Sequence, residues 1–566
     1  MSNLDKKPWL RYYEKGVPES LEYPDCSMID LIIDQAERWP NNVAYSYYGH
    51  NVTYKSFIKK IEKTARALKN YGVNAGDRVT ICMPNMPEGI IMVYAVNMIG
   101  AVCNMVHPLS SEKELEYYIR AAESKYVLVY DGVFEKIYKL RDTAKLERII
   151  VVRPTSGMGF LKKKMAKLLR IRGNVKLPRG DDRVVLWEEF ISRSFFYQGN
   201  YHEDRRADDD AVILYSGGTT GEPKGIVLSN LNFNGLGLMA TSMIRQAVPG
   251  STVLSILPIF HGFGLGVCVH TPLSKGMRCI LIPAFSHKQF GKIIKKNQPN
   301  FIAGVPTLFE GLLSNKMKKD DLDCVTSVIC GGDALNQTLR DKLNVFLAEH
   351  GSSARVRVGY GLTEATGATC LSPEEVFDNG IIGAPFPDMD FKIVKAGTMR
   401  EAKIGEEGEI CISGPLVMKR YLNDEKETDN VIWTNKDGER WLHTGDIGYL
   451  GKDGLIYFTQ RLKRIIVSSG YNIYPTYLEA IIGMHELVET SVVVGAPHKY
   501  KGQVPKAYIV LKKGVKPSKK IEKEIRILLE KNVAIYALPV EYIFKDELPK
   551  TAVGKVAFKK LENESI

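Results

Sequence analysis

The stretch Tyr215-Ser216-Gly217-Gly218-Thr219-Thr220-Gly221-Glu222-Pro223-Lys224-Gly225 decides how the rest of the chain is interpreted. The apolar run Ala211-Val212-Ile213-Leu214 precedes it, and Ile226-Val227-Leu228 follows it. We therefore expect a tight loop between two buried strands. The glycines let backbone N–H groups approach a ligand closely, while the hydroxyls and the lysine add donors, which is typical of a polyphosphate site. The alternative, a glycine-rich hairpin with a solvated lysine, explains the ordered Ser-Gly-Gly-Thr-Thr-Gly-x-Pro-Lys-Gly string less well.

A nucleoside-triphosphatase P-loop, G-x-x-x-x-G-K-S/T, does not fit, because Pro223 precedes Lys224 and Gly225 follows it. The string instead resembles the phosphate loop of the adenylate-forming superfamily, which contains acyl-CoA synthetases, peptide-synthetase adenylation domains and luciferases. The resemblance implies that residues 216–221 and Lys224 bind ATP. Gly217 stands where this family usually has a second hydroxyl residue, and a glycine there is most similar to the fatty-acyl branch.

The composition sets broad limits on the class of protein. A chain of 566 residues is too long for one ordinary core, so two or more domains are expected. The net charge of +12 suits nucleotides, CoA, anionic membranes and nucleic acid alike, and so does not discriminate between them. Nine cysteines without a C-x-x-C pair and a start without an apolar signal region predict free thiols and a cytoplasmic location.

Strand and helix patterns alternate along the first part of the chain. Residues 27–39 are expected to form a helix capped by Ser27, and strands are expected at 78–82, 126–130 and 148–152. This alternation predicts α/β layers with parallel sheets. The apolar stretch 90–106 is interrupted by polar residues and is too short to span a membrane, so we expect a buried helix followed by a strand.

Residues 153–180 differ in character from their surroundings, because they contain nine basic residues and no acidic one. Phe160, Leu161, Met165 and Leu168 fall at helical spacing beside several lysines. The pattern allows a peripheral membrane helix that binds anionic lipid. It equally allows a surface helix whose apolar side packs on the domain, and we favour this second interpretation slightly.

Two further motifs suit a carboxylate substrate and a metal–phosphate group. His261 lies in Pro258-x-Phe260-His261-x-x-Gly264, which resembles the substrate gate of the superfamily, where the imidazole lies near the carboxylate. The string Tyr360-Gly361-Leu362-Thr363-Glu364 follows a predicted strand, and its carboxylate and hydroxyl are of the types that Mg²⁺ and phosphate require. In the family, Tyr360 stacks on adenine, Thr363 contacts phosphate and Glu364 holds magnesium.

The resemblance also implies the positions that hold the nucleoside. Gly332, Asp333 and Ala334 follow a predicted strand and correspond to the adenine slot. Asp446 in Thr444-Gly445-Asp446 and Arg461 correspond to the ribose clamp, although an Asp in a Gly-Asp pair is more often plain turn chemistry. The acyl pocket is expected at His261, 301–307, 330–335 and 365–367, where small residues suggest room for a medium or long acyl chain or an aryl acid.

The C-terminal part is expected to form a small, mobile domain. By resemblance, the chain folds into a large N-terminal domain of layered α/β sheets with a β-barrel-like subdomain, residues 1–461, and a small α+β domain, residues 462–566, joined at the hinge Lys463. Ser469, Gly470 and Tyr471 are implied to line the channel for the thiol of CoA. Pro549-Lys550-Thr551-x-x-Gly554-Lys555 resembles the family's catalytic-lysine segment, so Lys555 is expected to stabilise charge between carboxylate and α-phosphate.

These motifs occur in the family's order and predict an acyl-CoA synthetase that uses ATP, Mg²⁺ and coenzyme A. The expected partner is a small-molecule carboxylic acid, with a medium- or long-chain fatty acid favoured, and no obligate protein partner is expected. An aryl-acid CoA ligase and a carrier-protein ligase share all motifs of the first step. An alternative of another class is a non-catalytic protein that binds anionic membranes. Nucleic-acid binding is not expected, since no RNP, zinc-finger or helix-turn-helix signature occurs.

Overall fold

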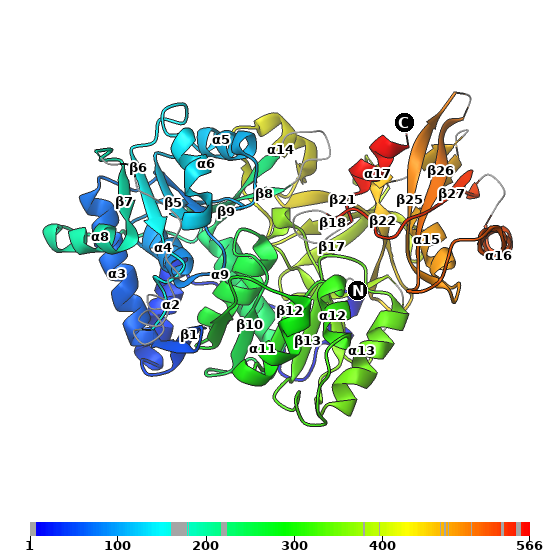
Figure 1. Ribbon diagram of the computed structural model, residues 1–566, viewed down its shortest axis with the longest axis horizontal. Coiled ribbons are helices and arrows are strands. Elements are labelled where there is room, and N and C mark those ends of the chain that lie inside the picture. The colour runs from blue at the N-terminus through cyan, green and yellow to red at the C-terminus, as the bar shows by residue number, and fades with distance from the viewer. Residues whose placement is uncertain are drawn as a thin grey trace. The chain divides into compact units, whose positions relative to one another are not determined.

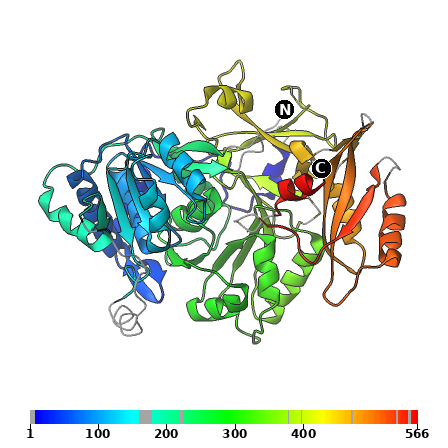
Figure 2. The ribbon, with the colours of Figure 1, turned by 45° about the horizontal axis from the view of Figure 1, so that its top comes forward.

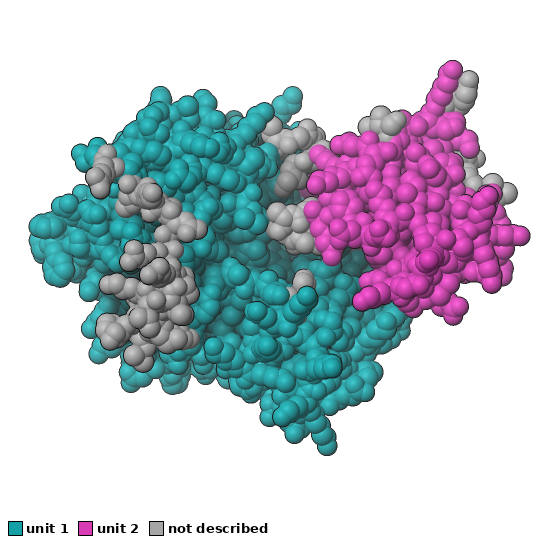
Figure 3. Space-filling view, viewed as in Figure 1, with its two compact units in different colours: residues 1–391, 412–442 teal, residues 392–411, 443–566 magenta. Residues whose placement is uncertain are grey.

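The computed structural model describes most of the chain, and the described residues form two compact units. Unit 1 comprises residues 1–391 and 412–442, and unit 2 comprises residues 392–411 and 443–566 (Figure 3). The structure describes residues 7–159, 178, 180–216, 223–376, 378, 380–395, 397–464, 466–468, 471–473, 475–499, 501–533, 537–550 and 556–565. The boundaries between these units lie after residues 391, 411 and 442, and not at residue 461. The predicted domain boundary and the hinge at Lys463 stay predictions.

One sheet of unit 1 is mainly parallel. Its order is β16 (Ile381–Pro385), β15 (Cys370–Leu371), β14 (Val356–Tyr360), β13 (Ser327–Gly331), β12 (Phe301–Gly304), β10 (Thr252–Ser255), β11 (Arg278–Leu281), β1 (Val43–Tyr47) and β2 (His50–Thr53). The strands from β14 to β1 pair in parallel, and the edge pairs β14–β15, β15–β16 and β1–β2 are antiparallel. The carboxyl ends of β12, β13 and β14 therefore meet at one edge.

The second sheet of unit 1 carries the phosphate-loop strands. Its order is β19 (Arg420–Tyr421), β9 (Lys224–Ser229), β8 (Asp210–Ser216), β4 (Val102–Met105), β3 (Arg78–Cys82), β5 (Tyr126–Tyr130), β6 (Arg148–Val152) and β7 (Val184–Leu186). Figure 1 shows this sheet largely in blue and cyan, and the first sheet largely in green. β8 and β9 form an antiparallel pair, so the prediction of two buried strands around the loop is confirmed.

Helices fill the space between the two sheets. Every residue of α4 (Pro87–Met98) is buried, and this helix packs on β3 and β4. α9 (Asn230–Ser242) packs on β9 of one sheet and on the π-helix η4 (Phe263–His270), which in turn contacts β10 of the other sheet. A helix surrounded by protein needs no polar face, which explains why α4 is apolar on all sides apart from the buried Glu88 and Asn97. The predicted buried helix and strand at 90–106 are thus confirmed.

Unit 1 contains further helices, most of them short. α2 (Met28–Arg38) begins at the predicted cap Ser27, whose hydroxyl and Asp30 form a capping box. The other helices are η1 (Pro8–Tyr12), α3 (Tyr54–Asn70), α5 (Glu112–Ala121), η2 (Asp131–Val133), α6 (Phe134–Lys139), α8 (Trp187–Ser192), η3 (Arg193–Phe196), α10 (Thr271–Leu273), η5 (His287–Gln289), α11 (Phe290–Asn297), α12 (Pro306–Leu313), α13 (Gln337–Glu349), η6 (Thr363–Ala365) and α14 (Glu425–Val431). β20 (Ile432–Thr434) pairs with the start of β21 (Arg440–Leu450).

Unit 2 contains two groups of strands. The first group has the strand order β17 (Asp390–Val394), β18 (Gly408–Ser413), β21 and β22 (Ile456–Arg461). Only parts of β17, β18 and β21 belong to unit 2. The other sheet has the order β24 (Tyr471–Ile473), β23 (Ile466–Ser468), β26 (Gly502–Leu511) and β25 (Val488–His498), with β27 (Glu541–Phe544) also paired to β26. The short helix η7 (Leu462–Arg464) connects β22 to β23.

The two faces of the second sheet of unit 2 are covered by different helices. Val493, Ala507 and Ile509 belong to a cluster with α15 (Pro475–Gly483) and α16 (Lys519–Glu530). Val492 and Tyr508, one residue away, belong to a cluster with α17 (Phe558–Glu564). Alternate residues of a strand point to opposite faces, so the apolar residues of β25 and β26 pack against helices on both faces of the sheet. Figure 2 shows α17 in red on one face of this sheet and α16 in orange-red on the other.

The predicted α/β class is confirmed, with a large sheet-containing part followed by a smaller C-terminal part. Among the described residues, no helix is both long enough and apolar enough to cross a bilayer. Residues 160–177, which make up most of the basic stretch 153–180, lie outside the described residues. The predicted amphipathic helix and its membrane contact therefore stay predictions.

Candidate functional site

The ends of the phosphate loop are described, whereas residues 217–222 lie outside the described residues. Ser216 is the last residue of β8, and Lys224 is the first residue of β9, directly opposite it in the antiparallel register. The strand ladder therefore fixes where the loop starts and ends. The contributions of Gly217, Gly218, Thr219, Thr220 and Gly221 stay predictions.

The phosphate-loop strand and the Thr363-Glu364 turn come together in unit 1. β14 ends at Tyr360, and η6 begins at Thr363, so the turn lies at the carboxyl edge of the sheet. The Oε1 atom of Glu364 accepts hydrogen bonds from the Ser216 hydroxyl at 3.3 Å and the Tyr421 hydroxyl at 3.1 Å. Two motifs separated by more than a hundred residues thus share one carboxylate, as expected for parts of one site.

Tyr421 was not foreseen from the sequence. It lies on the two-residue strand β19, which pairs with β9 beside the phosphate loop. Burial, together with the neighbouring Glu364 carboxylate, raises the pKa of Tyr421, so its hydroxyl stays protonated and donates. No local pattern marks such a tyrosine, because its position depends on how a distant edge strand pairs.

Lys224 is paired within the site. Its ammonium group forms an ion pair with Glu427, which lies in the first turn of α14. The same group lies 5.0 Å from the centre of the Tyr421 ring, within the range of a cation–π contact. Ser216, Lys224, Glu364 and Tyr421 therefore form one connected polar cluster, and the predicted phosphate contact of Lys224 stays a prediction.

The His261 motif packs directly against the chain after Glu364. Gly367 has a φ of +98°, and a Cβ there would lie 2.5 Å from the carbonyl carbon of Gly262 and 2.6 Å from the nitrogen of Phe263. Only glycine allows this approach of two backbones. The hydroxyl of the buried Thr366 donates to the Leu416 carbonyl at 2.8 Å and fixes the turn. The His261 motif and the Thr-Glu motif thus lie side by side.

An apolar cavity begins next to these motifs and runs along the first sheet. One end is lined by Gly332, Gly359 and Gly367, at or just beyond the carboxyl ends of β13 and β14. The other end reaches Val253 and Phe301, at the amino ends of β10 and β12. The cavity encloses about 790 Å³ not occupied by atoms, its open end included. This space includes solvent at the open end, so it is an upper limit on the room inside the cavity.

The deep end of the cavity is closed by a hydrophobic cluster of Ala247, Val253, Met277 and Phe301. Of the positions predicted for the acyl pocket, Phe301 to Ala303, Gly332 and Gly367 line the cavity. Gly304 does not line it and instead makes room for the Leu308 side chain, whose Cδ2 would lie 2.4 Å from a Cβ at this position. The sequence could not show this difference, because a glycine that accommodates a neighbouring side chain and a glycine that lines a cavity are the same residue type.

The predicted adenine positions lie at the same edge of the sheet. Gly332, Asp333 and Ala334 follow β13 and are exposed, and the Asp333 carboxylate accepts from the Ala334 N–H at 2.9 Å. Tyr360 is half-buried at the end of the neighbouring strand β14. This edge is where ligands bind in open α/β sheets. The arrangement is consistent with a nucleoside slot, and the individual contacts stay predictions.

The predicted ribose pair is brought together in unit 2. Asp446 on β21 and Arg461 on β22 are partners in the antiparallel register, and the Arg461 Nε lies 3.2 Å from the Asp446 Oδ1. Asp446 is buried, whereas the Arg461 side chain is exposed. An aspartate positioned by a strand pair, and not by a free turn, offers a fixed acceptor for hydroxyl groups.

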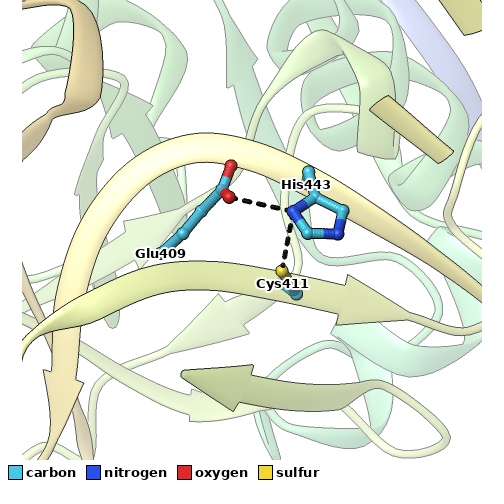
Figure 4. Close-up of side chains that lie close together, drawn as sticks. All are labelled: Glu409, Cys411 and His443. Atoms are coloured by element: carbon cyan, nitrogen blue, oxygen red, sulfur yellow. Dashed lines mark hydrogen bonds and ion pairs between the residues drawn. The ribbon is translucent and has the colours of Figure 1, made fainter. Parts of the chain in front are cut away.

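A buried network supports residues 444–446 of β21, where the φ of +68° at Gly445 departs from regular strand geometry; we call this segment the turn of Asp446. The Glu409 Oε1 accepts from the Gly445 N–H at 3.0 Å, and its Oε2 lies 2.9 Å from the His443 Nδ1. Cys411, two residues after Glu409, places its Sγ 3.4 Å from the same nitrogen (Figure 4). Burial, and secondly the charge of Glu409, raise the pKa of the Cys411 thiol. The sequence patterns singled out the turn but gave no signal for this network.

The remaining predicted residues cannot be placed in the site. Lys463 lies in η7, and Tyr471 begins β24, but their side chains lie outside the description. Ser469, Gly470 and Lys555 lie outside the described residues. Glu364 and Asp446 belong to different units, so the predicted convergence of the motifs on one nucleotide stays a prediction.

Comparisons with known proteins agree with the order of the motifs. Residues 32–422 match the family described as AMP-binding enzyme, and residues 477–555 match the AMP-binding enzyme C-terminal domain. The chain is 33% identical over 565 residues to a long-chain-fatty-acid–CoA ligase of Bacillus subtilis (strain 168), covering 99% of this chain and 98% of that protein. It is 29% identical over 516 residues to a probable 4-coumarate–CoA ligase 3 of Dictyostelium discoideum, covering 89% and 88%.

The fold agrees as well. The crystal structure of ATP-bound MatB from Rhodopseudomonas palustris has a TM-score of 0.82 at 23% identity and covers 96% of this chain and 99% of that chain. The family match spans more than half of the sequence and includes the phosphate-loop strands, the Thr-Glu turn and the cavity. The chain therefore belongs to the AMP-binding enzyme family.

Proposed function

We propose that this protein is an AMP-forming acyl-CoA synthetase that activates long-chain fatty acids. The full-length similarity to a long-chain-fatty-acid–CoA ligase supports the reaction class. The observation that carries the choice of acid is the apolar cavity in unit 1. It runs from Phe263 of the His261 motif and Gly367, which follows the Thr-Glu turn, to the amino ends of β10 and β12. This elongated apolar lining suits a long apolar chain.

The first step joins the fatty acid to ATP. The carboxylate attacks the α-phosphate, the bond to the β-phosphate breaks, and acyl-AMP and pyrophosphate form. We assign the phosphate contacts to the 216–221 loop, Lys224 and Thr363, and we place the His261 imidazole near the carboxylate. These donors lower the barrier by holding anions together and by stabilising the charge that develops between them.

Glu364 has the surroundings that a magnesium site requires. Mg²⁺ is usually held by one or two carboxylates together with substrate phosphates. Glu364 is half-buried, and the hydrogen-bond donors to its Oε1 are the neutral hydroxyls of Ser216 and Tyr421, which orient the carboxylate without cancelling its charge. When bound, the ion would neutralise phosphate charge. Glu364 would hold it, and Ser216 and Tyr421 would position Glu364.

The remaining predicted residues are assigned to the nucleoside, the reacting groups and the thiol. We assign Asp446 and Arg461 to the ribose, Tyr360 and residues 332–334 to adenine, and Lys555 to the charge shared by carboxylate and α-phosphate. For the second step, rotation about Lys463 withdraws Lys555 and presents Ser469, Gly470 and Tyr471 to CoA. The thiolate then displaces AMP and forms the thioester. A lysine on a domain that rotates between the steps would suit a group that is needed in only one of the two steps.

The Lys555→Ala variant tests this division of labour. We expect the rate of ATP–pyrophosphate exchange to fall at least about 100-fold, because one charge-stabilising donor is lost. Thioester formation from supplied acyl-AMP and CoA should fall much less. Normal exchange in the variant would refute the assignment. Replacement of CoA by a phosphopantetheinyl carrier protein in the second assay distinguishes a CoA ligase from a carrier-protein ligase.

A substitution at the deep end of the cavity tests the acyl substrate. Ala247→Phe adds a ring beside Met277 and Phe301, and it should lower kcat/KM for palmitate at least about tenfold while octanoate is affected much less. Ala348→Phe, on the exposed side of α13, serves as the control. Pyrophosphate release is measured over acids from octanoate to stearate and with 4-coumarate. A wild-type preference for 4-coumarate would contradict the proposal.

A further inference from the structure

Three side chains of unit 2 that the proposed chemistry does not use come together behind the turn of Asp446. They are Glu409, Cys411 and His443, which are 5%, 0% and 8% exposed. The Oε2 of Glu409 lies 2.9 Å and the Sγ of Cys411 lies 3.4 Å from the Nδ1 of His443. All three atoms lie within 4.8 Å of one another (Figure 4). A carboxylate, a thiol and an imidazole thus point toward one buried position.

The strand geometry makes this meeting a fixed feature. Glu409 and Cys411 are two residues apart on β18, so their side chains project from the same face. His443 comes from β21, the neighbouring strand in the sheet. Sites that are built on paired strands keep their geometry better than sites on loops. The three groups therefore form a preorganised set within unit 2.

We propose that Glu409, Cys411 and His443 bind one Zn²⁺ ion, or a similar soft divalent transition metal. Oxygen, sulfur and nitrogen from these residue types are the donors that Zn²⁺ takes in proteins. Thiolate and imidazole select such metals against Mg²⁺ and Ca²⁺, which prefer oxygen ligands alone. The inference concerns unit 2 by itself and does not depend on the proposed reaction.

The distances between the donor atoms fit this ion. In a tetrahedral site with bonds of about 2.0–2.3 Å, neighbouring donor atoms lie roughly 3.3–3.7 Å apart. The Cys411–His443 distance of 3.4 Å agrees, and the Glu409–His443 distance of 2.9 Å requires a separation by a few tenths of an ångström. A thiolate, a carboxylate and a neutral imidazole also cancel the charge of a divalent ion, which reduces the cost of burying it.

The site also has the outer support that metal sites need. The second oxygen of Glu409 accepts the Gly445 N–H at 3.0 Å, so the carboxylate is oriented while Oε2 stays directed at the metal position. Gly445 precedes Asp446, and Thr444 is anchored to the Ile410 carbonyl at 2.6 Å. A bound ion would therefore tie the strand that supplies Glu409 and Cys411 to the turn of Asp446. Three protein ligands leave a fourth position for water.

Cobalt substitution tests the proposal on the full-length protein. The protein is stripped with a chelator and titrated with Co²⁺ without nucleotide or Mg²⁺. We expect one equivalent to give a near-ultraviolet thiolate-to-cobalt charge-transfer band and intense visible bands of tetrahedral cobalt. Zn²⁺ should then abolish the bands by displacement, and elemental analysis of the Zn²⁺ form should give one zinc per chain.

Two variants assign the ligands. Cys411→Ser should lose the charge-transfer band and bind Zn²⁺ at least tenfold more weakly, and His443→Asn should weaken binding similarly. Cys103→Ser, which replaces a buried thiol that donates to the Val93 carbonyl, is the matched control and should behave as wild type. Absence of cobalt bands in the wild type, or unchanged bands in Cys411→Ser, would overturn the proposal. The cluster would then be a metal-free Glu409–His443 pair.

Discussion

Glu364 of unit 1 and Glu409 of unit 2 are both carboxylates held by two hydrogen bonds, but their partners differ. Glu364 is half-buried, and neutral hydroxyls of Ser216 and Tyr421 donate to it. Glu409 is 5% exposed and faces the imidazole of His443 and the Gly445 N–H. Hydroxyl donors orient a carboxylate and leave its charge to a ligand, whereas a buried imidazole pairs with the carboxylate inside the protein.

The comparison separates two uses of the same side chain. Oxygen surroundings at an accessible edge of a sheet suit a hard cation that arrives with polyphosphate. Nitrogen and sulfur surroundings between buried strands suit a soft cation or a structural ion pair. We therefore expect substitutions at Glu364 to affect catalysis, and those at Glu409 to affect the stability of unit 2 and the geometry of the Asp446 turn.

The largest effect is expected for Glu364→Gln. The amide keeps the shape and can still accept from Ser216 and Tyr421, but it lacks the charge. ATP–pyrophosphate exchange should fall at least about 100-fold, as for the loss of other groups that stabilise transition-state charge. Urea unfolding should change by less than about 0.5 kcal/mol, because the site is not part of the core. Glu349→Gln, at the exposed end of α13, is the control, and a loss below fivefold would contradict the assignment.

The opposite pattern is expected for Glu409→Gln. Removal of the charge leaves the buried His443 without its acidic partner, which should lower the free energy of unfolding by about 2 kcal/mol. The KM for ATP should rise severalfold because the turn of Asp446 loses support, while kcat changes less. Unfolding and kinetics are measured on chelator-treated protein, so that no bound metal contributes. A variant with wild-type stability and a large loss of kcat would contradict the assignment of Glu409 to the stability of unit 2.

A smaller effect is expected for Tyr421→Phe, which removes one of the two donors to Glu364. A hydrogen bond to a charged carboxylate contributes about 1.5–3 kcal/mol, so adenylation should slow roughly tenfold or more, while Ser216 still orients Glu364. Tyr197→Phe removes a hydroxyl that donates to the Asn200 carbonyl at an exposed position, and it should leave the rate unchanged. Equal rates for both variants would mean that Tyr421 does not position Glu364.

These residues also show how far the sequence could predict the site. Ser216 and Glu364 belong to strings whose order and residue types indicate a phosphate site, and β8, β9 and β14 form where the apolar runs predict them. Asp446 and Arg461 were expected to act together, and the pairing of β21 with β22 brings them together. Motifs with several constrained residues in a short window carry enough local information for such predictions.

The missed residues have a common physical cause. Tyr421 reaches Glu364 because the edge strand β19 pairs with β9, and His443 meets Glu409 because β21 lies beside β18. Neither pairing leaves a periodic signal in the sequence, since strand order is set by packing of the whole sheet. The cavity was predicted only in part for the same reason. Whether a glycine such as Gly304 leaves space or accommodates a neighbouring side chain depends on the neighbour.

The smallest effect is expected at an exposed counterpart of the Glu409–His443 pair. His202 Nε2 lies 2.9 Å from Asp30 Oδ1, and this hydrogen bond raises the pKa of His202. A raised pKa in the folded state adds stability that is complete below about pH 6.5 and is lost as the pH rises through the folded pKa. Because both side chains are partly solvated, the contribution should stay below about 1 kcal/mol.

His202→Gln measures that contribution. Urea unfolding should show the variant to be less stable than wild type at pH 6, and the difference should shrink toward zero at pH 9 and in 1 M salt, where screening is strong. A difference that stays the same at both pH values would assign the effect to packing and not to charge. The loss of unfolding free energy at pH 6 can then be compared for Glu409→Gln and His202→Gln. Equal losses would mean that burial does not strengthen a carboxylate–imidazole pair. The contrast between Glu364 and Glu409 would then depend only on the ligands that each binds.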